Sequence, residues 1–318
     1  MTTTLDTKDT QWLKSFFGKN VKFNESMSKH TSLRVGGPAD VFVTPKNQDQ
    51  LFELIGWAAH RQIPYLVVGE GTNLLVKDKG IRAIIISLVT CLNEITKTDL
   101  GKSKYRVDAM AGASLKSLCR FAINNSLSGM NFAIGIPGTI GGSIKMNAGT
   151  SQGVMEDVLD TILLLLPDGK IQNIGKNQLD FSYRNLSLGS NGNEPAGNYP
   201  IILSGCFILN HTHDQEFKNE AKLILKDRKK KQPIGWASAG CFFKNPSTKQ
   251  PAGMLMDQAG LKGKTKGRAK ISTKHANFIL NTGNATAADI LWLMKYAQEI
   301  VFKQFNINLQ PEVKIVGE

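Results

Sequence analysis

The chain has 318 residues, and its 39 basic and 26 acidic side chains give a formal net charge of +13. This length allows a large core divided between two or three lobes, and a composition of 41% hydrophobic and 20% charged residues is ordinary for a globular protein. No apolar run approaches the ~18 residues of a membrane span, and residues 1–19 contain no apolar segment of a secretory signal. We therefore expect a globular, cytoplasmic protein without a membrane partner.

The thiols and imidazoles do not form a metal-binding pattern. Paired C-x-x-C spacing, typical of zinc sites, is absent among the four cysteines, and a disulfide framework is equally unexpected: Cys91, Cys119, Cys206 and Cys241. His211 and His213 alternate as at a strand end, which is compatible with a metal pair or with a solvated turn. We favour the turn and predict no metal.

The positive charge is compatible with nucleic acid or with a small polyanion. One basic cluster, residues 226–231, ends a predicted helix, where cations suit the helix dipole. A second cluster, residues 262–274, has no interleaved aromatic side chains on which bases could stack. We expect a phosphate-rich nucleotide ligand, no nucleic acid and no obligate protein partner.

In chain order, a polar leader is followed by a strand at 41–43 and by a helix that begins near Asn47 and Gln50, the two residues of a predicted capping box. A buried strand at 65–68 then runs directly into Gly69-Glu70-Gly71-Thr72-Asn73-Leu74. A strand entering such a turn is a candidate phosphate-binding segment, although a plain turn is the commoner outcome.

Strands at 81–87 and 105–109 and a helix capped by Ser114, with Cys119 on its buried face, lead to the segment around which the chain is organised. In residues 129–149, five glycines surround one proline: Gly135, Gly138, Gly141, Gly142 and Gly149. This density predicts a loop rather than a helix or strand interior. Its N–H groups are suited to forming a concave nest for a pyrophosphate, yet both familiar phosphate-binding fingerprints are missing.

The remainder alternates strands and helices. A strand at 161–166 and a Pro-Asp-Gly turn precede a strand at 201–209, and a last amphipathic helix opens at Thr286 and Asp289. We place the start of a separate lobe near residue 208, because the sequence beyond it has its own helices, strands and basic face. The overall class is α+β.

Five motifs in order resemble the UDP-N-acetylenolpyruvoylglucosamine reductase family, and the likeness extends from Thr31 to Val313. They are Ile136-Pro137-Gly138-Thr139-Ile140-Gly141-Gly142, Met146-Asn147-Ala148-Gly149, Tyr183-Arg184, Gly240-Cys241-Phe242-Phe243-Lys244-Asn245-Pro246 and Pro311-Glu312-Val313. Each motif alone is weak, whereas five in the correct order are hard to obtain by chance.

The resemblance implies two α+β FAD-binding subdomains, of the type in vanillyl-alcohol oxidase and p-cresol methylhydroxylase, and a C-terminal α+β substrate domain. We place these at residues 31–100, 101–208 and 209–318, after a leader of residues 1–30. FAD would lie against two groups of residues. The first is Gly69, Glu70, Gly71, Thr72, Asn73 and Leu74, and the second is Gly112, Gly135, Ile136, Pro137, Gly138, Thr139, Gly141, Gly142, Asn147, Ala148 and Gly149.

The family's reaction is an NADPH-dependent, FAD-linked reduction of an enolpyruvyl UDP-sugar to UDP-N-acetylmuramate, in peptidoglycan precursor synthesis. By resemblance, Arg184 stabilises the developing negative charge and Glu312 assists in polarisation or proton transfer. Cys241 occupies a position at which the family usually has serine, and we assign it the role of proton donor. A small buried residue is the alternative for Cys241.

Five further residues match or adjoin family positions near the substrate: Tyr183, Arg228, Lys231, Lys244 and Asn245. We predict that Lys244 and Asn245 contact the UDP diphosphate, while His275-Ala276-Asn277 receives only a structural role. Two rivals remain open from sequence. One is an FAD oxidase of the same fold acting on an alcohol or hydroxy acid, and the other is a nucleic-acid-binding protein.

Overall fold

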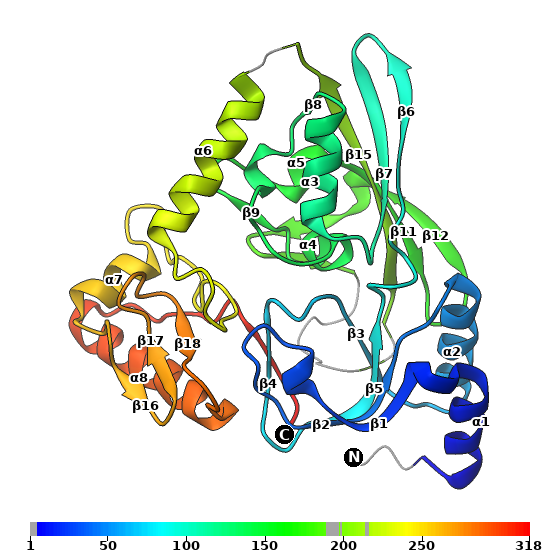
Figure 1. Ribbon diagram of the computed structural model, residues 1–318, viewed down its shortest axis with the longest axis horizontal. Coiled ribbons are helices and arrows are strands. Elements are labelled where there is room, and N and C mark those ends of the chain that lie inside the picture. The colour runs from blue at the N-terminus through cyan, green and yellow to red at the C-terminus, as the bar shows by residue number, and fades with distance from the viewer. Residues whose placement is uncertain (1–4, 189–196, 198, 214–215) are drawn as a thin grey trace. The chain divides into compact units, whose positions relative to one another are not determined.

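The computed structural model describes residues 5–188, 197, 199–213 and 216–318. Backbone contacts divide the chain into two units, whose elements are labelled in Figure 1. Unit 1 comprises Met1–Phe23, Val41–Glu70 and Ala83–Lys226, and unit 2 comprises Asn24–Asp40, Gly71–Arg82 and Asp227–Glu318. The four-part division at residues 30, 100 and 208 remains a prediction.

The main sheet of unit 1 is antiparallel and has the strand order β12-β11-β15-β7-β6, with β8 also paired to β15. Its strands are β6 (Ile95–Gly101), β7 (Lys104–Met110), β8 (Leu127–Ser128), β11 (Leu159–Leu165), β12 (Ile171–Gly175) and β15 (Ile201–His211). The strands predicted at 105–109, 161–166 and 201–209 are therefore confirmed within one or two residues. β15 continues past residue 208, the predicted start of the last lobe.

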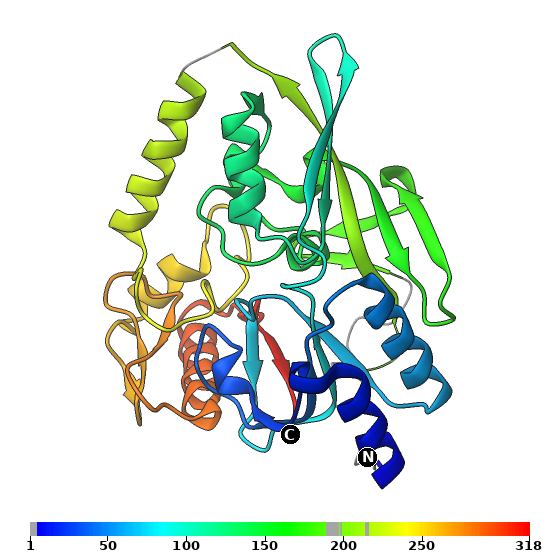
Figure 2. The same cartoon turned by 45° about the vertical axis from the view of Figure 1, so that its right-hand side comes forward.

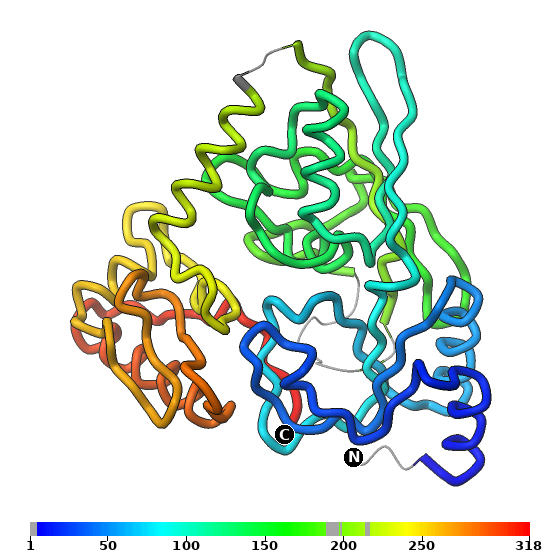
Figure 3. The backbone as a smooth tube through the Cα atoms, viewed as in Figure 1, coloured from blue at the N-terminus to red at the C-terminus, as the bar shows by residue number. Residues whose placement is uncertain are grey.

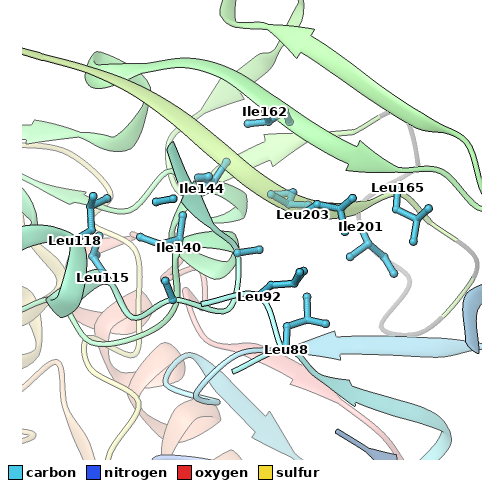
Figure 4. Close-up of a cluster of buried hydrophobic side chains, with 14 of the residues drawn as sticks. Leu88, Leu92, Leu115, Leu118, Ile140, Ile144, Ile162, Leu165, Ile201 and Leu203 are labelled. Atoms are coloured by element: carbon cyan, nitrogen blue, oxygen red, sulfur yellow. The ribbon is translucent and has the colours of Figure 1, made fainter. Parts of the chain in front are cut away.

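Three helices lie on one face of this sheet: α3 (Leu115–Asn124), α4 (Ile140–Lys145) and α5 (Met155–Val158) (Figures 1 and 2). Ser114 caps α3 as predicted, because its Oγ accepts a hydrogen bond from Ser117 N at 3.0 Å. Figure 4 shows the core between the helices and the sheet, where leucines of α3 and isoleucines of α4 approach strand residues such as Leu203. Cys119 is buried in this core, as the sequence predicted.

A second sheet has the order β1-β2-β5-β3. Its strands are β1 (Val21–Ser26), β2 (Pro38–Val43), β3 (Tyr65–Val68) and β5 (Ile81–Ser87), and β3 runs parallel to β5. Helix α2 (Gln48–His60) contributes four buried side chains, and Asn47 Oδ1 accepts from Gln50 N at 2.9 Å. The Gln50 side chain bonds to Lys46 N rather than to Asn47 N, so the predicted capping box is shifted by one residue.

Helix α1 (Thr7–Phe17) corrects the expectation of a polar leader. Asp6 and Asp9 form a reciprocal capping box, with Asp9 N donating to Asp6 Oδ1 at 2.7 Å and Asp6 N donating to Asp9 Oδ2 at 3.1 Å. Leu13 and Phe17, four residues apart on one helix face, are buried. Most residues of this helix are polar because only a few of its side chains, including Leu13 and Phe17, are buried.

Unit 2 is built around α8 (Ala287–Phe305), which contacts an antiparallel sheet of β16 (Thr265–Lys266), β17 (Ala269–Ile271) and β18 (Ile279–Asn281). The predicted start of α8 is confirmed, since Thr286 and Asp289 form a capping box. Helix α7 (Ala252–Gln258) contacts α8, and α6 (Glu216–Lys231) carries the chain between the units. No helix among the described residues is both long and apolar enough to cross a membrane.

The C-terminal strand of unit 2 pairs with a strand from much earlier in the chain. β19 (Lys314–Val316) lies parallel to β4 (Leu74–Val76), with Lys314 opposite Leu74, and the red and cyan segments meet in the tube of Figure 3. The remaining short elements are β9 (Gly149–Thr150), β10 (Gly153–Val154), β13 (Asp180–Ser182), β14 (Asn185–Ser187), η1 (Gly18–Asn20), η2 (Met27–Lys29), η3 (Asn131–Ala133) and η4 (Lys176–Gln178). The β13–β14 hairpin and the β4–β19 pair carry predicted site residues.

Candidate active site

Within unit 1, the turn after β3 packs against the glycine-rich loop. A Cβ built on Gly69 would lie 2.3 Å from Oγ1 of Thr139, so only glycine allows this approach. Glu70 Oε2 accepts a hydrogen bond from Gly138 N at 3.2 Å. Gly135 and Gly138 have φ angles of +78° and +120°, which side chains rarely permit. The first part of one predicted phosphate-binding segment therefore adjoins the other.

The glycine-rich loop contains a helix that the sequence did not predict. Gly141 and Gly142 lie inside α4, whose N–H groups of Ile140 and Gly141 donate to the carbonyls of Ala113 and Ala111 at 2.8 and 2.9 Å. A Cβ on Gly141 would come within 2.9 Å of the Ala111 Cβ. The glycine thus serves close packing of a short helix, and the rule that dense glycines exclude a helix was wrong here.

Gly112 belongs to the same region, because a Cβ there would lie 2.0 Å from the carbonyl oxygen of Leu88. The segment Ala111–Ala113 is therefore held between residues 88–92 and α4. The N–H groups of Gly138, Ile140 and Gly141 all donate within the protein. Fewer N–H groups are therefore available to a phosphate than the five glycines suggested. Gly142 faces open space apart from Thr139 Oγ1, which would lie 3.5 Å from an added Cβ.

Residues 71–74 belong to unit 2. Gly71 has φ +61° and a Cβ there would meet the His30 carbonyl at 2.0 Å, so it also requires glycine. Asn73 Nδ2 donates to the Glu312 carbonyl at 3.1 Å, and Asn73 O accepts from Lys314 N at 3.0 Å. Asn73, predicted as a cofactor contact, thus fixes the backbone of the predicted catalytic Glu312.

Tyr183 and Arg184 form the two-residue tip of the β13–β14 hairpin, between the paired residues Ser182 and Asn185. Arg184 has φ +59°, a left-handed conformation that is costly for arginine and is often found at functional sites. Its Nη2 donates to Gly149 O at 2.8 Å, and its Nη1 makes a longer bond of 3.5 Å to Asn147 O. The guanidinium carbon also lies 5.2 Å from the centre of the half-exposed Tyr183 ring.

The three residues Asn147, Ala148 and Gly149, predicted to contact the cofactor, form the wall against which Arg184 is held. Ala148 N donates to Ser143 O at 2.9 Å, which continues the chain from α4. A Cβ on Gly149 would lie 2.4 Å from Gly153 O in the β9–β10 pair. The predicted catalytic arginine and these residues are therefore brought together in unit 1.

Unit 2 brings together the other predicted catalytic residues. The segment after Cys241 is bonded to the segment that contains Glu312, with Glu312 N donating to Phe242 O at 2.8 Å and Lys244 N donating to Gln310 O at 2.8 Å. Asn277 holds Phe243 from the other side: Phe243 N donates to its Oδ1 at 2.9 Å, and its Nδ2 donates to Phe243 O at 2.8 Å. These bonds give Asn277 the structural role predicted for its motif.

Three of the residues predicted to lie near the substrate differ in what they contact. Burial lowers the pKa of the Arg228 guanidinium, and the neighbouring Cys241 thiol acts in the opposite direction. Lys231 instead pairs with Asp227 at 2.9 Å on the exposed face of α6. Asn245 Oδ1 accepts from Ala252 N at 3.1 Å and thereby holds the start of α7. The Arg228 guanidinium therefore interacts electrostatically with the side chain of the predicted proton donor.

Lys314 is a residue of this cluster that the sequence analysis did not single out. Burial lowers the pKa of its ammonium group, and the positive charge of Lys244 lowers it further. Two neighbouring ammonium groups create a local positive potential that suits a phosphate-bearing ligand. The sequence analysis did not single it out, although Lys314 follows the predicted catalytic Glu312 by only two positions.

The residues of unit 1 suit a dinucleotide cofactor. Left-handed glycines, close loop packing and the open flank at Gly142 expose backbone, and no acidic residue other than Glu70 occurs in residues 69–70 and 135–149. A left-handed arginine held beside this backbone adds a fixed cation. The fold and the site thus suit a dinucleotide-binding protein whose sequence lacks the Gly-x-Gly-x-x-Gly fingerprint of βαβ folds.

Comparisons with known proteins identify the family. Residues 39–175 match the family model "FAD binding domain", and residues 232–316 match "UDP-N-acetylenolpyruvoylglucosamine reductase, C-terminal domain". The chain is 43% identical to UDP-N-acetylenolpyruvoylglucosamine reductase of Desulfosudis oleivorans, over 97% of this chain and 98% of that protein. The protein from Caldanaerobacter subterraneus subsp. tengcongensis is 40% identical over 93% of each.

A solved reductase of the same name from Thermus caldophilus superposes with a TM-score of 0.76 and 33% identity, covering 92% of this chain and 98% of that one. The chain therefore belongs to the UDP-N-acetylenolpyruvoylglucosamine reductase family, and it is an FAD-dependent oxidoreductase. The predicted α+β FAD-binding fold with its C-terminal domain is confirmed. FAD is its cofactor and NADPH its hydride donor.

Gly142 offers a direct test of where FAD lies. We expect Gly142→Ala to weaken FAD binding about tenfold, because the added methyl has room within the protein but would overlap a cofactor lying on the backbone. The melting temperature of the FAD-free protein should not fall, since alanine favours a helix. Fluorescence titration of the FAD-free protein with FAD measures the affinity.

Gly69→Ala is the comparison variant. It should lower both the FAD affinity and the melting temperature, because the added methyl clashes with Thr139. Unchanged affinity in Gly142→Ala would place the cofactor elsewhere.

Proposed function

We propose that this chain reduces UDP-N-acetylenolpyruvoylglucosamine, the compound named by its relatives, to UDP-N-acetylmuramate during peptidoglycan precursor synthesis. The observation that carries the proposal is the bonding of the Cys241 segment to the Glu312 segment, because it makes neighbours of the segments that carry the proposed proton source and the proposed catalytic carboxylate. FAD, when bound, accepts hydride from NADPH and delivers it to the enolpyruvyl group. Because these reactants are water-soluble, we propose the cytoplasm as the place of reaction.

Arg184 would stabilise the charge that the reaction creates. Hydride arriving at the terminal carbon of the enolpyruvyl group leaves negative charge on the adjacent carbon and its carboxylate. A guanidinium fixed in advance stabilises such charge without having to reorganise. The bond from Nη2 to Gly149 O and the stacked Tyr183 ring support this role, since they restrain the side chain before substrate arrives.

Cys241 would then supply the proton to the adjacent carbon. A thiol is a stronger acid than the serine hydroxyl that the family usually has at this position, so the replacement preserves the function of a general acid. Arg228 stabilises the thiolate that remains until a proton returns from water, which the interaction between the two side chains supports. Glu312, whose backbone is bonded to Phe242 and Asn73, would polarise the enolpyruvyl group or assist the proton step.

The nucleotide part of the substrate would contact the basic side of unit 2. Lys244 is proposed to bind the diphosphate, together with Lys314, whose ammonium group it influences. Asn245 would donate hydrogen bonds there, and Tyr183 is proposed to contact the sugar. Lys231 would add to the general positive potential, although its pairing with Asp227 reduces that contribution.

Stopped-flow absorbance tests the proposed reaction directly. NADPH should bleach the flavin of the purified protein, and the enolpyruvyl UDP-sugar should restore the colour much faster than dissolved oxygen does. Reoxidation by oxygen alone, with no acceleration by the UDP-sugar, would instead support an oxidase of the same fold. UDP-N-acetylglucosamine is the control ligand, because it carries the nucleotide and sugar but lacks the double bond.

A further inference from the structure

The side chain of Asn147 is oriented towards the hairpin that carries Arg184. We propose that Asn147 is a positioning residue for Arg184 and that Glu156 in turn holds Asn147. This inference rests on the role given to Arg184 in the proposed function. It also reassigns Asn147, which the sequence analysis had placed among the cofactor contacts.

The C-terminal end of α4 and the residues after it form several hydrogen bonds with the β13–β14 hairpin. Lys145 Nζ donates to Leu186 O on β14 at 2.7 Å, and Asn147 Nδ2 approaches Ser182 O on β13 at 3.4 Å. Arg184 itself donates to the carbonyls of Asn147 and Gly149. Both strands of the hairpin and its tip are therefore tied to residues 145–149.

Asn147 is the member of this set that contacts both a strand and the tip. Its side chain is 4% exposed, and its amide is used within the protein: Nδ2 also donates to Glu156 Oε2 at 3.3 Å, and Oδ1 accepts from Glu156 N at 3.1 Å. Its φ of +41° lies in the left-handed region, where asparagine is tolerated better than most residues. Donor, acceptor and backbone conformation together explain why asparagine occurs here.

The arrangement links the two ends of a short helix. α4 begins beside the proposed FAD-binding backbone at Thr139 and ends at the residues that hold Arg184. An active-site misplacement of about 1 Å can slow a reaction about 100-fold. The hydrogen bonds between residues 145–149 and the hairpin are therefore expected to affect the rate of flavin reoxidation. The Asn147 amide could donate to a cofactor only by giving up a bond to Glu156 or to Ser182.

Asn147→Asp keeps the shape of the side chain but removes both donors and places a carboxylate against Glu156. We expect reoxidation of reduced flavin by the enolpyruvyl substrate to slow about 10- to 100-fold, while flavin reduction by NADPH and FAD affinity remain unchanged. Hydrogen exchange of the 180–187 segment should accelerate, which reports the loosened hairpin without reference to turnover. Asn173→Asp, an exposed asparagine on β12, is the matched control and should change none of these quantities.

Two further variants separate positioning from a general structural defect. In Asn147→Asp/Glu156→Gln the glutamine amide can donate to the new carboxylate, which restores the contact with residue 156 but not the bond to Ser182 O, so the hairpin protection and the reoxidation rate should recover in part. In an Arg184→Ala background, Asn147→Asp should slow reoxidation no further, because its effect passes through Arg184.

Three outcomes overturn or redirect the inference. Weaker FAD binding in Asn147→Asp, with normal hairpin protection, would return Asn147 to the cofactor contacts. Additive losses in the double variant would show that Asn147 does not act through Arg184. If Arg184→Ala alone reoxidises at the normal rate, the proposed role of Arg184 fails, whereas altered hydrogen exchange in Asn147→Asp would still establish the fastening of the hairpin.

Discussion

Arg184→Ala should slow flavin reoxidation by the enolpyruvyl substrate about 1000-fold while leaving flavin reduction by NADPH unchanged. The expectation follows from the loss of a cation held in place before charge develops, an effect of about 100- to 1000-fold for a single donor at such sites. Stopped-flow absorbance at the flavin band measures the two half-reactions separately. The alanine variant should still bind FAD, because the proposed cofactor contacts are backbone groups of other residues.

Two comparisons make this expectation specific. Arg184→Lys keeps the charge but cannot reproduce the planar fork that reaches the carbonyls of Gly149 and Asn147, so it should recover only part of the rate. Arg106→Ala removes an exposed guanidinium of the same unit, one that pairs with Asp108 at 2.9 Å, and should leave both rates normal. A wild-type reoxidation rate in Arg184→Ala would remove this residue from the mechanism.

Cys241→Ala should reduce the flavin normally with NADPH and then stall, with reoxidation by substrate slowed about 100- to 10,000-fold, the usual contribution of a general acid. Cys241→Ser should retain substantial turnover, because a hydroxyl can carry the same proton. The measurement is the reoxidation rate after single-turnover mixing. Equal rates in the serine and alanine variants would show that the proton comes from another group.

A second thiol serves as the control for the cysteine experiment. Cys91 is half-buried in unit 1, and burial raises its pKa to about 11, so it remains a thiol under the conditions of the assay. Cys91→Ala should therefore leave reoxidation unchanged. Incorporation of solvent deuterium into the product of Cys241→Ser confirms that the proton step is still completed.

The elements that the sequence predicted well are those with strong local signals. The apolar run 65–68 and the run 81–87 coincide with β3 and β5, and Ser114 and Thr286 mark helix starts through side-chain caps that act over three residues. In contrast, α4 was missed because its Gly141 is explained by close packing against Ala111, a residue 30 positions earlier in the sequence. Local rules cannot anticipate a close approach that the rest of the fold creates.

The candidate site likewise has features that the sequence suggested and features that only the structure reveals. Sequence motifs suggested Arg184, Cys241 and Glu312 as catalytic residues, which remains a prediction, and the structure adds the bonds of Arg184 and of the segments next to Cys241 and Glu312. The bonds of Asn147 to Ser182 and Glu156, and of Asn73 to Glu312, depend on which surfaces the fold brings into contact. Such partners carry no spacing rule, and the family resemblance placed both asparagines among the cofactor contacts.

The pairing of β19 with β4 has a consequence for how the protein is made. Unit 2 draws on residues 24–40, on 71–82 and on everything after 226, so its two early segments leave the ribosome long before their partners exist. Contacts between such distant parts of a chain form slowly. The hydrogen bonds between the Cys241 and Glu312 segments can therefore assemble only after residue 312 has left the ribosome, and a chain that stops at Val313, before β19, should not complete unit 2.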